Sequence, residues 1–122
     1  MIASAVFDRV EITSNTYGLT FGGNGTVAGT LRQSVIGESS QSGLYASPGA
    51  VYFTVEESSV IDNLATGIYL YSSGAIEVGA STIGGNGTGV GSSAGWLYSF
   101  GNNQMSANGS NGSFTPGGPG LQ

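Results

Sequence analysis

The sequence has 122 residues, of which 23 are glycine, and two arginines against seven carboxylates give a formal net charge of -5. Cysteine and histidine are absent, which excludes disulfides, zinc sites built from these residues, thiol catalysis and a Ser-His-Asp triad. Two cations cannot neutralise a phosphate backbone, so we expect no nucleic-acid partner. No apolar run approaches the roughly 20 residues of a membrane span, and no signal peptide is recognisable, so we expect no membrane partner and leave the compartment open.

A repeat of about two dozen residues, of the kind that marks solenoid proteins, runs through the chain. Residues 31–45 align without a gap with residues 55–69, at an offset of 24, and later copies follow after 23 and 22 residues. The length differences fall in Gly, Ser and Asn stretches, where loops tolerate them. We therefore predict one domain over residues 1–115 and a tail rich in Pro and Gly over 116–122. The predicted coils are 5–28, 29–52, 53–75, 76–97 and 98–115.

Short alternating apolar pairs recur in these copies and predict strands with one buried face. They are Phe53-x-Val55, Ile76-x-Val78 and Tyr98-x-Phe100. No long window keeps the period of a helix, and Asn-Gly and Gly-Gly steps interrupt the strands. The pattern predicts an all-β fold, a parallel β-helix of about five coils with a repeat of 22 to 25 residues.

Stacking of equivalent positions predicts three apolar ladders inside the column. The first contains Phe7, Leu31, Val55, Val78 and Phe100, the second Ile12, Ile36, Val60, Ile83 and Met105, and the third Leu19, Leu44, Ile68 and Val90. Each ladder is apolar along its whole length, which indicates that all three face the core.

Two further ladders lie at one turn of the repeat. Asparagines stack there, with Ser39 in the second coil, and their amides are expected to bond to each other and to the backbone. The glycines that follow are expected to supply a positive φ or a tight corner. The asparagines are Asn15, Asn63, Asn86 and Asn108, and the glycines are Gly18, Gly43, Gly67, Gly89 and Gly112.

These features resemble the right-handed parallel β-helix repeat proteins of the pectate-lyase-like superfamily. Residues 58–63 and 81–89 are similar to their recurring S-x-I-x-x-N-x-x-G coil, and residues 97–115 look like the last coil of uncharacterised bacterial members. The superfamily includes pectate lyases, other polysaccharide-active enzymes and adhesins. Its members are often bacterial and secreted or surface-associated. The resemblance therefore implies the fold and leaves the activity open.

The carboxylates indicate charge pairing more than catalysis. The alignment places Asp8, Arg32 and Glu56 in one column, and Arg9, Gln33 and Glu57 in the next. Glu38 and Asp62 also stack on neighbouring coils, where two like charges could hold a cation, although a solvated turn is the favoured interpretation. We assign no catalytic residue, no metal ligand and no cofactor.

Aromatic side chains are the better candidates for function. Tyr45 and Tyr69 stack in register, one position after an inward residue, so we expect them to face outward, with Tyr71 and Trp96 beside them. Such a row can bind sugars or another protein. We expect a non-enzymatic structural or recognition protein that forms homo-oligomers through coil ends or a flat face. The alternative is a carbohydrate-binding or polysaccharide-active protein, or an inactive remnant of one.

Overall fold

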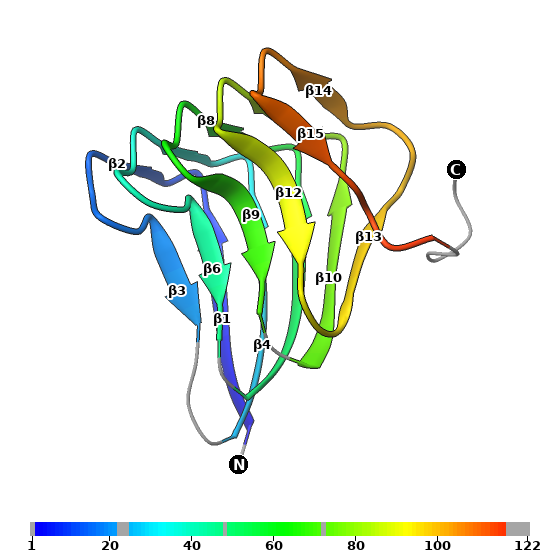
Figure 1. Ribbon diagram of the computed structural model, residues 1–122. Helices are drawn as coiled ribbons and strands as arrows, with labels where there is room; N and C mark the ends of the chain where they lie inside the picture. The colour runs from blue at the N-terminus through cyan, green and yellow to red at the C-terminus, as the bar shows by residue number, and fades with distance from the viewer. Residues whose placement is uncertain (1, 22–24, 48, 72, 117–122) are drawn as a thin grey trace.

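The computed structural model describes residues 2–21, 25–47, 49–71 and 73–116, which form a column of parallel strands (Figure 1). The strands belong to three sheets. Sheet A contains β1 (Ile2–Asp8), β4 (Thr26–Arg32), β7 (Ala50–Glu56), β10 (Ser73–Gly79) and β13 (Trp96–Ser99). Sheet B contains β2 (Glu11–Thr13), β5 (Val35–Gly37), β8 (Ser59–Ile61), β11 (Thr82–Gly84) and β14 (Gln104–Ser106). Sheet C contains β3 (Leu19–Phe21), β6 (Leu44–Ala46), β9 (Thr66–Leu70), β12 (Thr88–Ser92) and β15 (Ser110–Gly112).

The predicted all-β parallel solenoid is confirmed. In the described part of the chain, each sheet has five strands and therefore four steps from coil to coil. The column thus has about four turns, slightly fewer than the five coils expected. Of the predicted tail, residues 117–122 lie outside the described residues.

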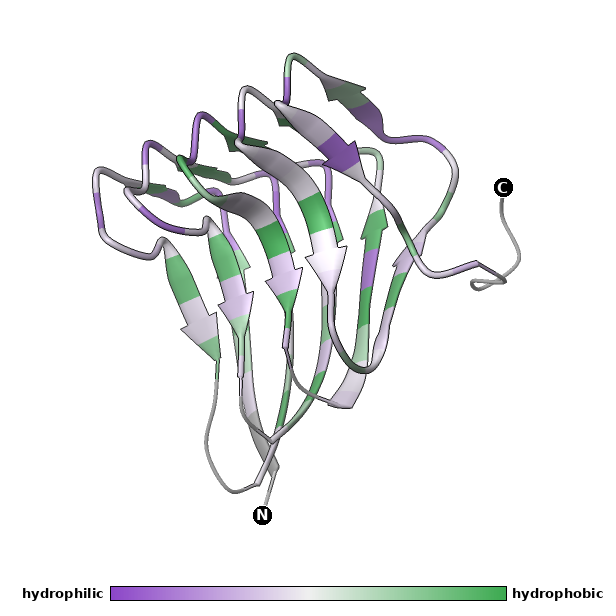
Figure 2. Ribbon diagram, viewed as in Figure 1, coloured by the Kyte–Doolittle hydropathy of each residue, from purple (hydrophilic) through white to green (hydrophobic). Residues whose placement is uncertain are grey.

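The core forms because inward side chains alternate with outward ones along each strand. On β7 and β10, the inward residues Phe53, Val55, Ile76 and Val78 are at most 2% exposed. Figure 2 shows the resulting apolar bands aligned across neighbouring strands. The second and third predicted ladders pair as expected, from Ile12 to Met105 and from Leu19 to Val90.

The prediction for the last coil of sheet A is wrong by one residue. Val78 is paired with Ser99, not with Phe100, and Leu97 is the fully buried residue opposite Ile76. Because side chains alternate, this one-residue shift turns Tyr98 outward. Tyr98 and Phe100 form the more apolar alternating pair, so the sequence pattern favoured the wrong register, whereas the structure places Leu97 and Ser99 opposite Ile76 and Val78.

Left-handed backbone conformations make the corners of each coil, but mostly at residues other than glycine. Ser14, Glu38 and Asp62 occupy equivalent corner positions, with φ angles of 61°, 56° and 58° respectively. Of the two roles expected for the corner glycines, Gly112 has a positive φ of 73°, whereas Gly43 and Gly67 have none. They are needed for close approach, because a Cβ atom on Gly43 would lie 2.8 Å from the carbonyl oxygen of Gly67.

The last coil is covered by the segment that follows it. Thr115 donates its backbone N–H to the carbonyl of Leu97 at 2.7 Å, and its Oγ1 accepts the N–H of Leu97 at 3.0 Å. Phe114 packs against the core beside this pair.

Candidate functional site

A row of tyrosines lies on the outer face of sheet C. Tyr45 on β6 and Tyr69 on β9 are directly paired in register, and both point outward because their neighbours along the strand are buried. Their rings are stacked, with centroids 5.9 Å apart and planes 11° apart.

The row differs from the predicted one at both ends, because it includes Tyr17 and lacks Trp96. Tyr17, in the loop before β3, places its ring centroid 5.3 Å from that of Tyr45, and Tyr71 lies 6.1 Å from Tyr69. Trp96, in contrast, is on β13 of sheet A, opposite Ala75. Tyr17 was missed because it lies in a loop outside the aligned aromatic column. We name Tyr17, Tyr45, Tyr69 and Tyr71 the tyrosine row.

The strands beneath the tyrosine row carry no charge. The described strands of sheet C contain no Asp, Glu, Lys or Arg. The ring of Tyr69 leans over Gly91 on the next strand, where a Cβ atom would lie 3.2 Å from the ring. The outer surface of sheet C is therefore uncharged and partly covered by aromatic rings.

The expected charge columns form only in part. Arg32 Nε lies 3.6 Å from Asp8 Oδ1 across two coils, as the alignment suggested. Arg9 Nη1 lies 3.0 Å from Asp8 Oδ2, so this second ion pair forms within one coil. Glu56 is in register with Arg32. Both arginines of the chain are thus held by Asp8.

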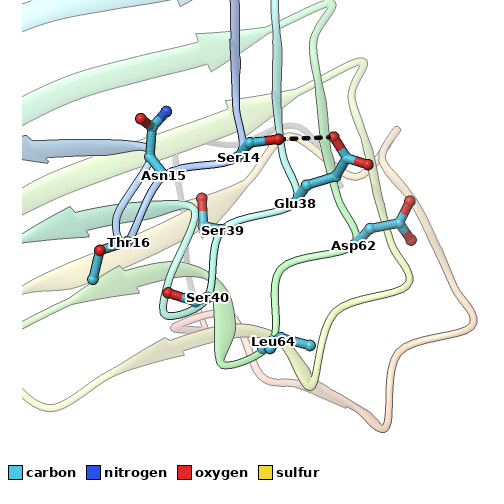
Figure 3. Close-up of a pocket in the computed structure, with 8 residues that line it drawn as sticks. All are labelled: Ser14, Asn15, Thr16, Glu38, Ser39, Ser40, Asp62 and Leu64. Atoms are coloured by element: carbon cyan, nitrogen blue, oxygen red, sulfur yellow. Dashed lines mark hydrogen bonds between the residues drawn. The ribbon is translucent and has the colours of Figure 1, made fainter.

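Glu38 and Asp62 lie at equivalent corners of neighbouring coils, and both line a hollow of about 480 Å³ (Figure 3). The Ser14 hydroxyl donates to Glu38 Oε1 at 3.5 Å, and Leu64, which is 76% exposed, borders the same hollow. Among the described residues, no three carboxylates come together in a way that would hold a metal ion. The arrangement offers two carboxylates and several hydroxyls at an open surface.

Comparison with known families classifies the chain. Residues 3–119 match the family described as the right handed beta helix region. The chain belongs to this family. No curated protein and no solved structure matches at a significant level. No helix within the described ranges is long and apolar enough to span a membrane.

Beneath the surface, the β-helix contains a hydrogen-bonded asparagine ladder. Asn86 is central to it: its Oδ1 accepts the backbone N–H of Asn63 at 3.0 Å and the side-chain amide of Asn63 at 2.9 Å. Its Nδ2 donates to the carbonyl of Val60 and to Asn108 Oδ1. Asn15 is exposed, and its side chain bonds to the carbonyl of Thr13 in its own coil.

A ladder of serines, which the repeat pattern did not predict, runs parallel to the asparagines at the corner between sheets A and B. Ser58 Oγ accepts the backbone N–H of Ser34 and donates to the carbonyl of Glu56, at 3.2 and 2.8 Å. Ser81 makes the same two bonds one coil later. These serines occupy one column of the repeat, which could have predicted the ladder, but serine is common in turns and the column alone does not indicate hydrogen bonds between coils.

Two buried serines of the β-helix should respond oppositely to alanine substitution. Ser58→Ala is expected to lower the free energy of unfolding by about 2 kcal/mol, since it leaves the buried N–H of Ser34 without its acceptor. The carbonyl of Glu56 loses the Ser58 hydroxyl but keeps the N–H of Gln33. Ser39, which is 1% exposed, has a buried hydroxyl with no partner, so Ser39→Ala should cost nothing or stabilise. Urea unfolding of both variants measures the difference. Equal losses would contradict this account of the two hydroxyls.

Proposed function

We propose that this chain is a non-catalytic β-helix module that associates with a second copy of itself through the outer face of sheet C. The observation that carries the proposal is the tyrosine row on an uncharged sheet. Tyr45 and Tyr69 present large amphipathic surfaces there, and tyrosine is enriched in the cores of protein interfaces.

Charge distribution favours sheet C over sheet A. The chain carries a net charge of -5, so two copies repel each other wherever their carboxylates meet. On sheet A, Asp8, Glu56 and Glu77 would face their counterparts. Sheet C lets two copies approach without burying a charge.

The size of the face sets the expected strength of association. Five strands stacked about 4.8 Å apart, with three outward-facing residues or fewer on each, give roughly 300 Å² per copy. A stable dimer typically buries about 800 Å² per partner. We therefore expect a weak dimer whose population depends on protein concentration.

Light scattering behind a sizing column, over a concentration series, tests the proposal. The natural chain is expected to shift from monomer to dimer as concentration rises, and Tyr45→Glu to remain monomeric because each copy would bury a charge. Thr20 is paired in register with Tyr45 on the neighbouring strand, so Thr20→Glu should also keep the chain monomeric. Tyr52→Glu adds the same charge on β7 of sheet A and should leave the dimer intact.

A natural chain that stays monomeric at every concentration would overturn the proposal. So would a dimer that survives both sheet C substitutions, provided circular dichroism shows that the variants are folded. Loss of the dimer in Tyr52→Glu alone would place the interface on sheet A.

Glycan cleavage is the second candidate function, and the hollow between Glu38 and Asp62 favours it. Glycoside hydrolysis uses two carboxylates that face one cavity. Release of new reducing ends from a panel of polysaccharides tests this candidate, with Asp62→Asn as the inactive control. Failure to release any would exclude hydrolysis of those polysaccharides and leave the non-catalytic proposal in place.

A further inference from the structure

The outer face of sheet A gathers aromatic rings around a single carboxylate. Tyr52 on β7 is paired with Ala75 on β10, and Ala75 with Trp96 on β13. Two residues along the same strands, Glu77 is paired with Tyr98. All five side chains point outward, because the residues between them, Phe53, Ile76 and Leu97, are buried.

Three of these residues line a small hollow in the outer face of sheet A. Tyr52, Ala75 and Glu77 line a hollow of about 180 Å³, with Thr54 beside them. Ala75 makes the depression, because its methyl group stands between the larger side chains of Tyr52 and Trp96. Tyr52 and Trp96 are both 53% exposed, so about half of the surface of each residue remains accessible to a ligand.

Neither arginine pairs with the carboxylate of Glu77 in the part of the chain that the structure describes. The chain has only two cationic side chains, and both Arg9 and Arg32 pair with Asp8. An aromatic ring face attracts a cation through its quadrupole, and a carboxylate beside it adds direct attraction. Tyr52 and Glu77 offer this combination across one depression.

We propose that this hollow is a binding site for an organic ammonium group, held between the ring of Tyr52 and the carboxylate of Glu77. The net charge of -5 supports the choice of a cationic ligand over an anionic or neutral one. Ala75 leaves room for the methyl groups of a quaternary ammonium, and Trp96 is paired with Ala75 on the next strand toward the last coil.

Choline is the probe, and 3,3-dimethylbutan-1-ol is its uncharged counterpart of nearly the same shape. Trp96 is the single tryptophan of the chain, so its fluorescence reports on this site. With choline replacing sodium at constant chloride, we expect a saturable change in emission. The uncharged alcohol should give none.

Substitutions identify the groups responsible. Glu77→Gln and Tyr52→Leu should each raise the dissociation constant of choline about fivefold, through loss of the ion pair and of the cation–π contact. Glu56→Gln removes the same charge from the same sheet outside this hollow and should leave the constant unchanged. Tyr69→Leu on sheet C should also have no effect, which separates this site from the proposed dimer face.

Equal responses to choline and to the alcohol would overturn the proposal, because they would show apolar contact alone. A Glu77→Gln variant that binds choline as tightly as the natural chain would also overturn it. Because Glu77 points outward from β10, its substitution leaves the core untouched, and circular dichroism verifies the fold of each variant.

Discussion

Asn86→Ala is expected to lower the free energy of unfolding by about 4 kcal/mol, because four side-chain hydrogen bonds are lost at once, three of them with buried partners. The N–H and the side-chain amide of Asn63 lose their acceptor, and the carbonyl of Val60 loses its donor. Asn86 and Asn63 are at most 2% exposed, so water does not replace these bonds. Urea unfolding followed by circular dichroism measures the loss.

Asn15→Ala is the matched control for the asparagine ladder. Asn15 stands in the same column of the repeat, but among the described residues its exposed amide bonds only to the carbonyl of Thr13, so the loss should stay below about 1 kcal/mol. Similar losses for the two variants would show that the inter-coil bonds of Asn86 contribute little.

Gly67→Ala is expected to destabilise the fold by about 3 kcal/mol through steric conflict in a packed corner. The added Cβ would lie 2.7 Å from the carbonyl oxygen of Gly89 and 2.8 Å from Asn86 Nδ2. One contact is with backbone, and the other is with the ladder amide, so neither neighbour can move without breaking inter-coil hydrogen bonds. Thermal and urea unfolding should agree on the loss.

Gly91→Ala serves as the comparison, because it adds the same methyl group to another strand position of sheet C. Its Cβ would meet only the ring of Tyr69, at 3.2 Å, and that ring lies on the outer face, where it can shift. We expect a change of less than about 1 kcal/mol. A loss as large as that of Gly67→Ala would contradict the close-approach explanation for the corner glycines.

Most of the fold was predictable because the period is so regular. An offset of 24 residues aligned Ile36 with Val60 and Leu44 with Ile68, and both pairs are in register in the structure. The prediction failed at Tyr98, where the alternating pair Tyr98 and Phe100 favoured one register but Leu97 is the residue that packs in the core.

The candidate surfaces were harder to predict than the core. Tyr45 and Tyr69 could be placed together because they occupy one column of the repeat. Trp96 could not be assigned to a sheet, because it lies next to a loop whose length varies between coils. Tyr17 reaches the row through a loop conformation that no periodic pattern encodes.

The direction of the side-chain bonds between coils has a consequence for synthesis on the ribosome. The backbone N–H groups of Ser34, Ser39 and Asn63 are all satisfied by side chains of the coil that follows. A coil that has just left the exit tunnel therefore lacks its acceptors until about two dozen further residues emerge. Folding of each coil is therefore expected to lag its translation by one coil. Leu97 shows the same dependence, because its N–H is accepted by Thr115, 18 residues later in the chain.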